Sequence, residues 1–338
     1  MKTIYKYLIL FFIFVCSSCE NEIPFNVENS SPKLILNALL EAGRETNYIS
    51  IGLTGRDSAS FVDNAKIDIY INNELKEVIT ETCLPDDSVY YKMKAYKMTA
   101  RFFPGDLVKV EVRTDDGKYY AWAEDFVPEV INIEKIDTFL FIGKRPDLDI
   151  DYAYLHLMMP FTDNPDKRNF YRLTVTENTS FYGISEFTAK DSVYVYEYHH
   201  NLYNQEDIVL NDGRLPNDDN NRPFPEAKNW FNVFNDSYLN GTYDMRINLG
   251  MLSWYYMPLH MDVKRIATKV KVRLISITET EFFYLKALNS YASSDFDFFL
   301  TQPVLFPGNV HGGVGILGFE ADCNQTISLP DYCLEENI

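Results

Sequence analysis

The chain has 338 residues and a formal charge of −18, and 46% of its residues are hydrophobic. This hydrophobic fraction supplies a substantial core and excludes a disordered chain. The acidic excess argues against a nucleic-acid-binding protein, because the negatively charged phosphates of nucleic acids bind to basic patches. It also disfavours adsorption to an anionic membrane surface. At this length, two domains are the default expectation.

Residues 1–18 predict a lipoprotein signal peptide. Lys2 and Lys6 form a positive start, residues 8–15 are an uninterrupted apolar run, and two serines lead into Cys19 as at a small-residue processing site. The apolar run is too short to span a bilayer, which needs about 20 residues. We therefore expect cleavage before Cys19 and acylation of this cysteine, for example with palmitate, as the first residue of the mature chain.

An acidic tether, residues 19–31, leads into a first domain at residues 32–128. Short segments there alternate apolar and polar residues, which is the period of half-buried strands. Turn-forming residues such as Asn72 and Asn73 separate them. The pattern predicts a compact antiparallel β-sandwich of the immunoglobulin-like or prealbumin-like kind. Its expected strands are residues 33–40, 48–53, 65–71, 108–112 and 119–123.

Residues 129–338 predict a second β-rich domain with one helix. Thr278 and Glu281 form a capping box ahead of an apolar run, which predicts a helix from Thr278 to about Ala292. The long polar connection at 201–241 is typical of a functional or mobile loop. The fold class is therefore mainly β, with two β-sandwich-like domains, the second carrying the helix near the C-terminus. Its expected strands are residues 153–159, 170–176, 192–199, 243–249 and 268–277.

Three cysteines remain once Cys16 is assigned to the signal peptide and Cys19 to the lipid. Cys323 and Cys333 lie close together in a turn-rich tail, and an exported protein permits a disulfide between them. Two buried thiols are the alternative. Cys83 stays unpaired in either case.

Some short stretches match catalytic or cofactor-binding motifs in their residue letters, but not in the structural context that these motifs need. Residues 313–318 read G-x-G-x-x-G, but a dinucleotide site needs a βαβ unit around it, so a close-packed strand or turn is the better interpretation. His311 and the glycines after it resemble a lipase oxyanion loop, yet no G-x-S-x-G supplies a nucleophile. Glu197 and His199 lack a third zinc ligand at recognisable spacing. We predict a non-enzymatic protein with no cofactor and no metal site.

Two other features are candidates for binding. The Asn211–Asn221 loop carries oxygen donors of the kind that calcium takes, although a solvated turn-forming loop is the favoured interpretation. Trp230, Trp254 and Tyr255 are candidate contacts to a sugar or a partner protein, since rigid aromatic faces give contact area at low entropy cost. A carboxylate pair for glycoside hydrolysis is a further alternative, but nothing in the sequence selects the pair.

Several stretches together resemble one known family, the outer-membrane lipoproteins of Bacteroidota-type bacteria catalogued as domain of unknown function 4249. The resemblance covers essentially the whole mature chain, and it brings no catalytic motif with it. The stretches, in chain order, are SSC followed by acid, KLILNALL, VDNAKIDIYINNE, FFPGD before VKVEV, FTDNPDKRNFYRLTV, FNDSYLNGTYDMRI, ITETEFFYLKALNSY and PVLFPGNVHGGVGILGF.

The resemblance implies an outer-membrane lipoprotein that acts as a partner of a TonB-dependent transporter in substrate capture or assembly, because members are often encoded beside such transporters. It also implies that Glu20 and Glu22 belong to a surface-export signal, the alternative being a tether that faces the periplasm. Ser58, Ser88 and Ser192 lie in tripeptides that resemble O-glycosylation sites. A free-standing adhesin or glycan-binding lipoprotein is the alternative function.

Overall fold

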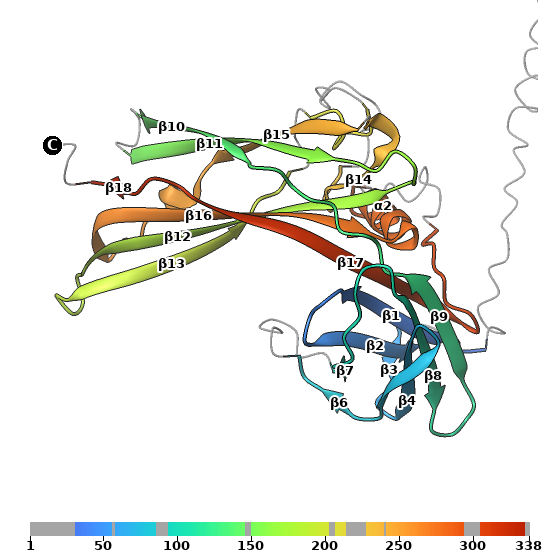
Figure 1. The fold of residues 1–338 in the computed structure, drawn as a ribbon. Coiled ribbons are helices and arrows are strands. Elements are labelled where there is room, and N and C mark those ends of the chain that lie inside the picture. Colours follow the sequence, from blue (N-terminus) through green and yellow to red (C-terminus); the bar gives the residue numbers. More distant parts are fainter. Residues whose placement is uncertain are drawn as a thin grey trace, which may run out of the picture.

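The computed structural model is drawn in Figure 1. The part of the chain that it describes forms three sheets, of 11, 4 and 3 strands, and one α-helix, α2 (Glu279–Ser293). The predicted mainly β fold class is therefore confirmed. In that same part, no helix is both long and apolar enough to cross a bilayer. The described residues are 31–55, 58–85, 94–145, 150–202, 207–213, 228–239, 241–293 and 305–334.

The first unit is a β-sandwich. One layer contains β1 (Leu34–Glu41), β2 (Asn47–Leu53), β3 (Ser60–Phe61), β6 (Thr82–Cys83) and β7 (Ala95–Met98). The other contains β4 (Ala65–Ile71), β5 (Glu74–Ile79), β8 (Leu107–Thr114) and β9 (Tyr120–Phe126). Alternate residues of β1 and β8 are buried between the layers, as their period-two pattern predicts. Asn72 and Asn73 both have positive φ, the conformation that a tight hairpin turn requires.

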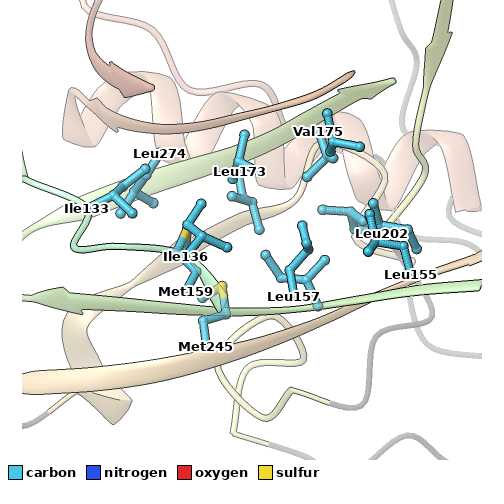
Figure 2. Packing of buried hydrophobic residues seen from close by; sticks show 14 of the residues in the cluster. Ile133, Ile136, Leu155, Leu157, Met159, Leu173, Val175, Leu202, Met245 and Leu274 are labelled. Carbon is cyan, nitrogen blue, oxygen red and sulfur yellow. The ribbon is translucent and has the colours of Figure 1, made fainter. Parts of the chain in front are cut away.

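The second unit packs a three-stranded sheet over the long strands of the 11-stranded sheet, and Figure 2 shows the core between them. The three-stranded sheet consists of β10 (Asp137–Arg145), β11 (Ile150–Thr162) and β15 (Thr242–Met251). The facing strands are β12 (Phe170–Ser185), β13 (Asp191–His199), β14 (Val233–Asn235), β16 (Met261–Ile277), β17 (Gly313–Ser328) and β18 (Tyr332–Cys333). The described residues of this unit also form two 3-10 turns, η3 (Asp236–Tyr238) and η4 (Ser253–Tyr256).

Strand β17 belongs to both units. The predicted boundary at residue 128 assigns this strand to the second domain alone. Its first half runs parallel to β1, from Gly313 to Glu320, and its second half runs antiparallel to β16. Leu317 and Phe319 complete the core of the first unit. Without β17, β1 would present an unpaired row of backbone groups. This pairing joins strands that are far apart in sequence, so local periodicity does not reveal it.

The glycine-rich stretch 313–318 is a close-packed strand, as the sequence analysis favours. A Cβ on Gly315, whose φ is +117°, would lie 2.1 Å from the carbonyl oxygen of Leu36. A Cβ on Gly313 would lie 2.5 Å from that of Leu34. The glycines therefore allow β17 to approach the backbone of β1, and no phosphate-binding role is needed to explain them.

The helix is placed correctly by the sequence, but its predicted capping box is wrong. Phe282 N donates to Thr278 O at 3.0 Å, which starts the helix as expected. Thr278 Oγ1 and both carboxylate oxygens of Glu281 are buried and find no hydrogen-bond partner among the described residues. Glu281 points inward onto Gly318 of β17 instead of back to the helix start. Packing of α2 on the sheet thus overrides the local capping preference.

Candidate functional site

Two loops from separate parts of the sequence meet where the units join. Asn169, in the loop between β11 and β12, donates from its side chain to Asp163 at 3.2 Å and to the carbonyl of Lys167 at 2.8 Å. Its backbone N donates to Asp236 of η3 at 2.6 Å. Both loops come from stretches that carry the family resemblance. The side chain of Asn169 therefore fixes the loop that forms one wall of the junction.

A buried tyrosine reinforces this wall. The hydroxyl of Tyr171 donates to the carboxylate of Asp163. Burial, followed by this hydrogen bond, raises the pKa of Tyr171. Burial also raises the pKa of Asp163, and the bond from Tyr171 opposes that rise. The pair holds the first turn of the loop against the core of the second unit.

A cleft of about 770 Å³ lies at this junction. Its walls are the end of β9 and the connection that follows it (125–134), the loop 162–171, and the boundary between β16 and α2 (276–279). This volume falls within the range of small-molecule sites, which often lie between domains. The cleft is therefore the candidate functional site.

Charged groups of both signs line the cleft. Burial raises the pKa of Asp125, and the negative charge of Glu279 acts in the same direction. Arg168 Nη1 lies 3.0 Å from Glu279 Oε1, and its guanidinium lies 5.0 Å from the ring centre of Phe170. The ion pair with Arg168 holds Glu279, and Asp125 is one of the carboxylates of residues 125–134 that also line the cleft. The arrangement suits a polar ligand that presents a hydrogen-bond donor or a cation to Asp125.

A second polar cluster lies inside the second unit, around Glu177 of β12. Its carboxylate accepts hydrogen bonds from His200 Nε2 at 2.9 Å, from Thr179 Oγ1 at 2.6 Å, and from both the backbone N and the hydroxyl of Ser253. Burial raises the pKa of Glu177, but these hydrogen bonds outweigh burial and leave the pKa lowered. The cluster therefore fastens η4 to β12.

The order of this cluster differs from that of a catalytic triad. In a triad, the imidazole lies between serine and carboxylate, so that it can take the serine proton. Here Glu177 lies between Ser253 and His200, and the serine donates to the carboxylate. Sequence reasoning missed this site. The available signal was a glutamate at an inward-facing position of a period-two strand.

Several predicted site residues are not tested by the structure. Cys19, Glu20, Glu22 and Ser88 lie outside the described residues. Ser58 lies in an exposed bend. Ser192 lies at the start of β13, where its hydroxyl donates to the carbonyl of Lys190 at 3.1 Å. O-glycosylation of these serines stays a prediction.

The aromatic candidates separate into core and surface. Trp254 is only 1% exposed, its Nε1 donates to Thr268 at 2.9 Å, and its ring stacks on Tyr332. The prediction that Trp254 contacts a ligand or partner is therefore wrong, because the indole is part of the core. Trp230 and Tyr255 are 37% and 47% exposed, so both remain at the surface.

The predicted disulfide is also wrong. Cys323 pairs with Leu274 of β16, whereas Cys333 pairs with Arg265, nine residues earlier on the same strand. This separation is about 30 Å at roughly 3.3 Å per residue, and a disulfide needs Cα atoms within about 7 Å. Both cysteines are thiols, as is Cys83. Closeness in sequence misled the prediction because β17 is extended.

The calcium prediction falls only partly on the described residues. Both carboxylate oxygens of Asp212 lie 2.7 Å from Lys286 Nζ of α2, so this aspartate is held in an ion pair. Residues 214–221 of the loop lie outside the described part of the chain. Within the described part, no group of three or more His, Cys, Asp or Glu residues is arranged to hold a metal ion.

The comparisons with known proteins give a family but no activity. A model of the family described as "Domain of unknown function (DUF4249)" matches residues 20–323. No curated protein matches the chain. The matched range contains the first unit, the cleft, α2 and the part of β17 that joins the two units. The chain therefore belongs to the DUF4249 family.

Proposed function

We propose that this chain is a non-enzymatic, lipid-anchored outer-membrane protein that faces the cell surface and assists a TonB-dependent transporter in substrate capture or assembly. The cleft at the junction of the two units carries the proposal. Its volume suits a small ligand, and its charged groups belong to both units. The order of Ser253, Glu177 and His200 supports the non-enzymatic part, since the imidazole does not lie between the serine and the carboxylate as it does in a catalytic triad.

The shape of the molecule supports a role next to a membrane partner. The 15 residues from Cys19 to Lys33 reach at most about 50 Å when fully extended, so lipidation at Cys19 would hold β1 near the bilayer. The strands of the second unit lead away from the first unit (Figure 1). With 17 residues, β16 alone extends about 55 Å. The second unit can therefore reach a partner that protrudes from the membrane.

The test is recovery of tagged native protein from detergent-solubilised outer membranes, with the bound proteins identified by mass spectrometry. The expected result is a β-barrel transporter together with a diacyl or triacyl mass on Cys19. A Cys19→Ala variant is the control for the anchor, and it should leave the membrane fraction. Recovery of the lipidated protein without any β-barrel would contradict the proposal.

Glycan binding is the second candidate, and exposed tyrosines favour it. Tyr255 and Tyr256 are both exposed on η4 and meet at an interplanar angle of 81°. Aromatic faces of this kind can stack on sugar rings. Binding to a glycan array that disappears in Tyr255→Ala, but not in Trp230→Ala, would place glycan recognition at η4.

A further inference from the structure

Strand β13 forms an open edge of the 11-stranded sheet. It pairs with β12 along its whole length, from Asp191 to His199, and no other described strand pairs with it. Figure 1 shows β13 at the border of the second unit, away from the first unit. An edge strand carries backbone N–H and C=O groups that can pair with another chain.

The register shows which backbone groups are open. The amide of His200 donates to Val175 O at 2.9 Å, and the amide of Ser185 donates to Lys190 O at 3.0 Å. In an antiparallel pair, alternate residues face the partner strand. The even-numbered residues of β13 therefore face β12. The N–H and C=O groups of Val193, Val195 and Glu197 point to the open side.

The middle of this edge lacks the usual protection against strand addition. Natural edges are shielded by proline, by charged side chains or by a bulge. Between Val193 and Tyr196 the sequence has neither proline nor charge, and the register with β12 is uninterrupted. Val193 and Val195 are 55% and 59% exposed on one face, and Tyr194 is 45% exposed on the other. An apolar edge of this kind suits a binding surface better than a solvated boundary.

The core-facing side of β13 offers positions for side chains of an added strand. Tyr194, Tyr196 and Tyr198 lie opposite Phe181, Thr179 and Glu177 of β12, on the face that packs on the core. Tyr256 of η4 stacks on Tyr196 with ring centres 5.0 Å apart. The aromatic row extends the core to the sheet edge, so alternate side chains of an added strand would meet tyrosine rings.

We infer that the open edge of β13 binds an extended segment of a partner protein, which adds to the sheet as one more strand. The segment has apolar side chains at alternate positions and a basic residue near Glu197, whose side chain is largely exposed. The formal charge of −18 disfavours a second copy of this chain as the occupant. The inference deepens the proposed function, and it rests on that function only in assigning the segment to a transporter.

The test uses the purified full-length chain and a library of random octapeptides with blocked ends. Peptides selected on the wild type should show alternating apolar residues. Val195→Pro removes one open N–H without breaking a bond to β12, and it should weaken the selected peptides about tenfold or more. Val195→Thr keeps the N–H and should stay within about threefold. Both variants should unfold at the wild-type temperature.

N-methylation of the best peptide sharpens the test. Methyl groups on the alternate amides that face β13 should abolish binding, and those on the other amides should leave it unchanged, because only one edge of the added strand pairs with β13. Equal binding of the selected peptides to Val195→Pro would overturn the inference. A concentration-dependent dimer that Val195→Pro dissolves would overturn it in favour of a second copy.

The outcome is separable from that of the proposed function. Equal recovery of a β-barrel transporter by the wild type and Val195→Pro would keep the proposed function and remove the β13 inference. Peptide binding that depends on Val195, with no β-barrel recovered from membranes, would keep the β13 inference and remove the transporter partnership.

Discussion

Two regions of the molecule bury a glutamate completely, and their surroundings differ. In the second unit, Glu177 accepts hydrogen bonds from Thr179, His200 and Ser253. At the junction of α2 with β17, Glu281 lies against Gly318, and neither of its oxygens has a hydrogen-bond partner among the described residues. The carboxyl group of Glu177 therefore has hydrogen-bond donors around it, whereas the equally buried carboxyl group of Glu281 has none among the described residues.

The comparison shows that the hydrogen bonds donated to a buried carboxyl group, and not its degree of burial, decide whether the group is ionised. Burial raises the pKa at both positions, and at Glu177 the donated hydrogen bonds reverse the shift. At Glu281, burial is the main cause and the negative charge of nearby Glu320 acts in the same direction, so its pKa is raised well above the ordinary 4.5. We expect Glu177 to be ionised and Glu281 to be neutral at moderate pH.

The largest effect is expected at Glu177. Replacing it with alanine leaves buried donors on His200 and Ser253 unpaired, so Glu177→Ala should lower the free energy of unfolding by about 3–5 kcal/mol. Chemical denaturation measures this change. Thr176→Ala, at the half-buried neighbouring position, is the control and should cost about 1 kcal/mol or less. A cost at Glu177 no larger than at Thr176 would show that the cluster does not hold η4.

The contact between α2 and β17 should be the next most sensitive. A Cβ on Gly318 would lie 2.7 Å from Glu281 Oε2 and 2.9 Å from Leu39 Cδ2. Gly318→Ala should therefore cost about 1–3 kcal/mol through overpacking. In a Glu281→Ala background the cost should shrink, because one of the two clashing groups is gone. A double-mutant cycle measures this coupling, and strictly additive costs would contradict the contact.

Replacing Glu281 should raise the free energy of unfolding by a smaller amount, which depends on pH. Its pKa is raised on folding, so its stabilising contribution is full below about pH 4.5 and is lost as the pH rises through the folded pKa. Glu281→Gln removes this dependence and should be about 1–2 kcal/mol more stable than the wild type at pH 8. Denaturation at pH 5 and pH 8 tests the sign. Glu177 acts oppositely, since its lowered pKa gives a contribution that is lost as the pH falls below about 4.5.

The smallest effect is expected at the ion pair between Lys286 of α2 and Asp212. The pair is partly exposed, with side-chain exposures of 24% and 60%. Pairs of this kind contribute about 0–1 kcal/mol, so Lys286→Ala should change the thermal midpoint by only a few degrees, and less at high salt. A large loss would show that this pair anchors α2 in a way that its exposure does not indicate.

The sequence predicted what depends on neighbours along the chain. Period-two alternation identified the principal strands, Asn72 and Asn73 identified a hairpin turn, and the helix was placed within a residue or two of its observed ends. Each of these features is set by local backbone preference or by a repeating burial pattern. Of the aromatic binding candidates, Trp230 and Tyr255 are at the surface, and their role in binding stays a prediction.

The sequence-based predictions that were wrong share a cause. Trp254 entered the core because Thr268 and Tyr332 come to it from other strands, and Cys323 and Cys333 separated because the chain between them is extended along β16. The capping box failed because Glu281 packs on β17. In each case contacts between residues distant in sequence decided the outcome, and for the capping box they outweighed a local preference of about 1 kcal/mol.

The sequence by itself thus determined that this is a mainly β protein with one helix near its C-terminus, because those elements follow from local periodicity. Only the tertiary structure decided that β17 joins the two units, that a cleft lies between them, and that β13 has an open apolar edge. These features depend on which strands pair across long stretches of chain. Strand pairing is a property of the whole fold, since every strand presents similar backbone donors and acceptors.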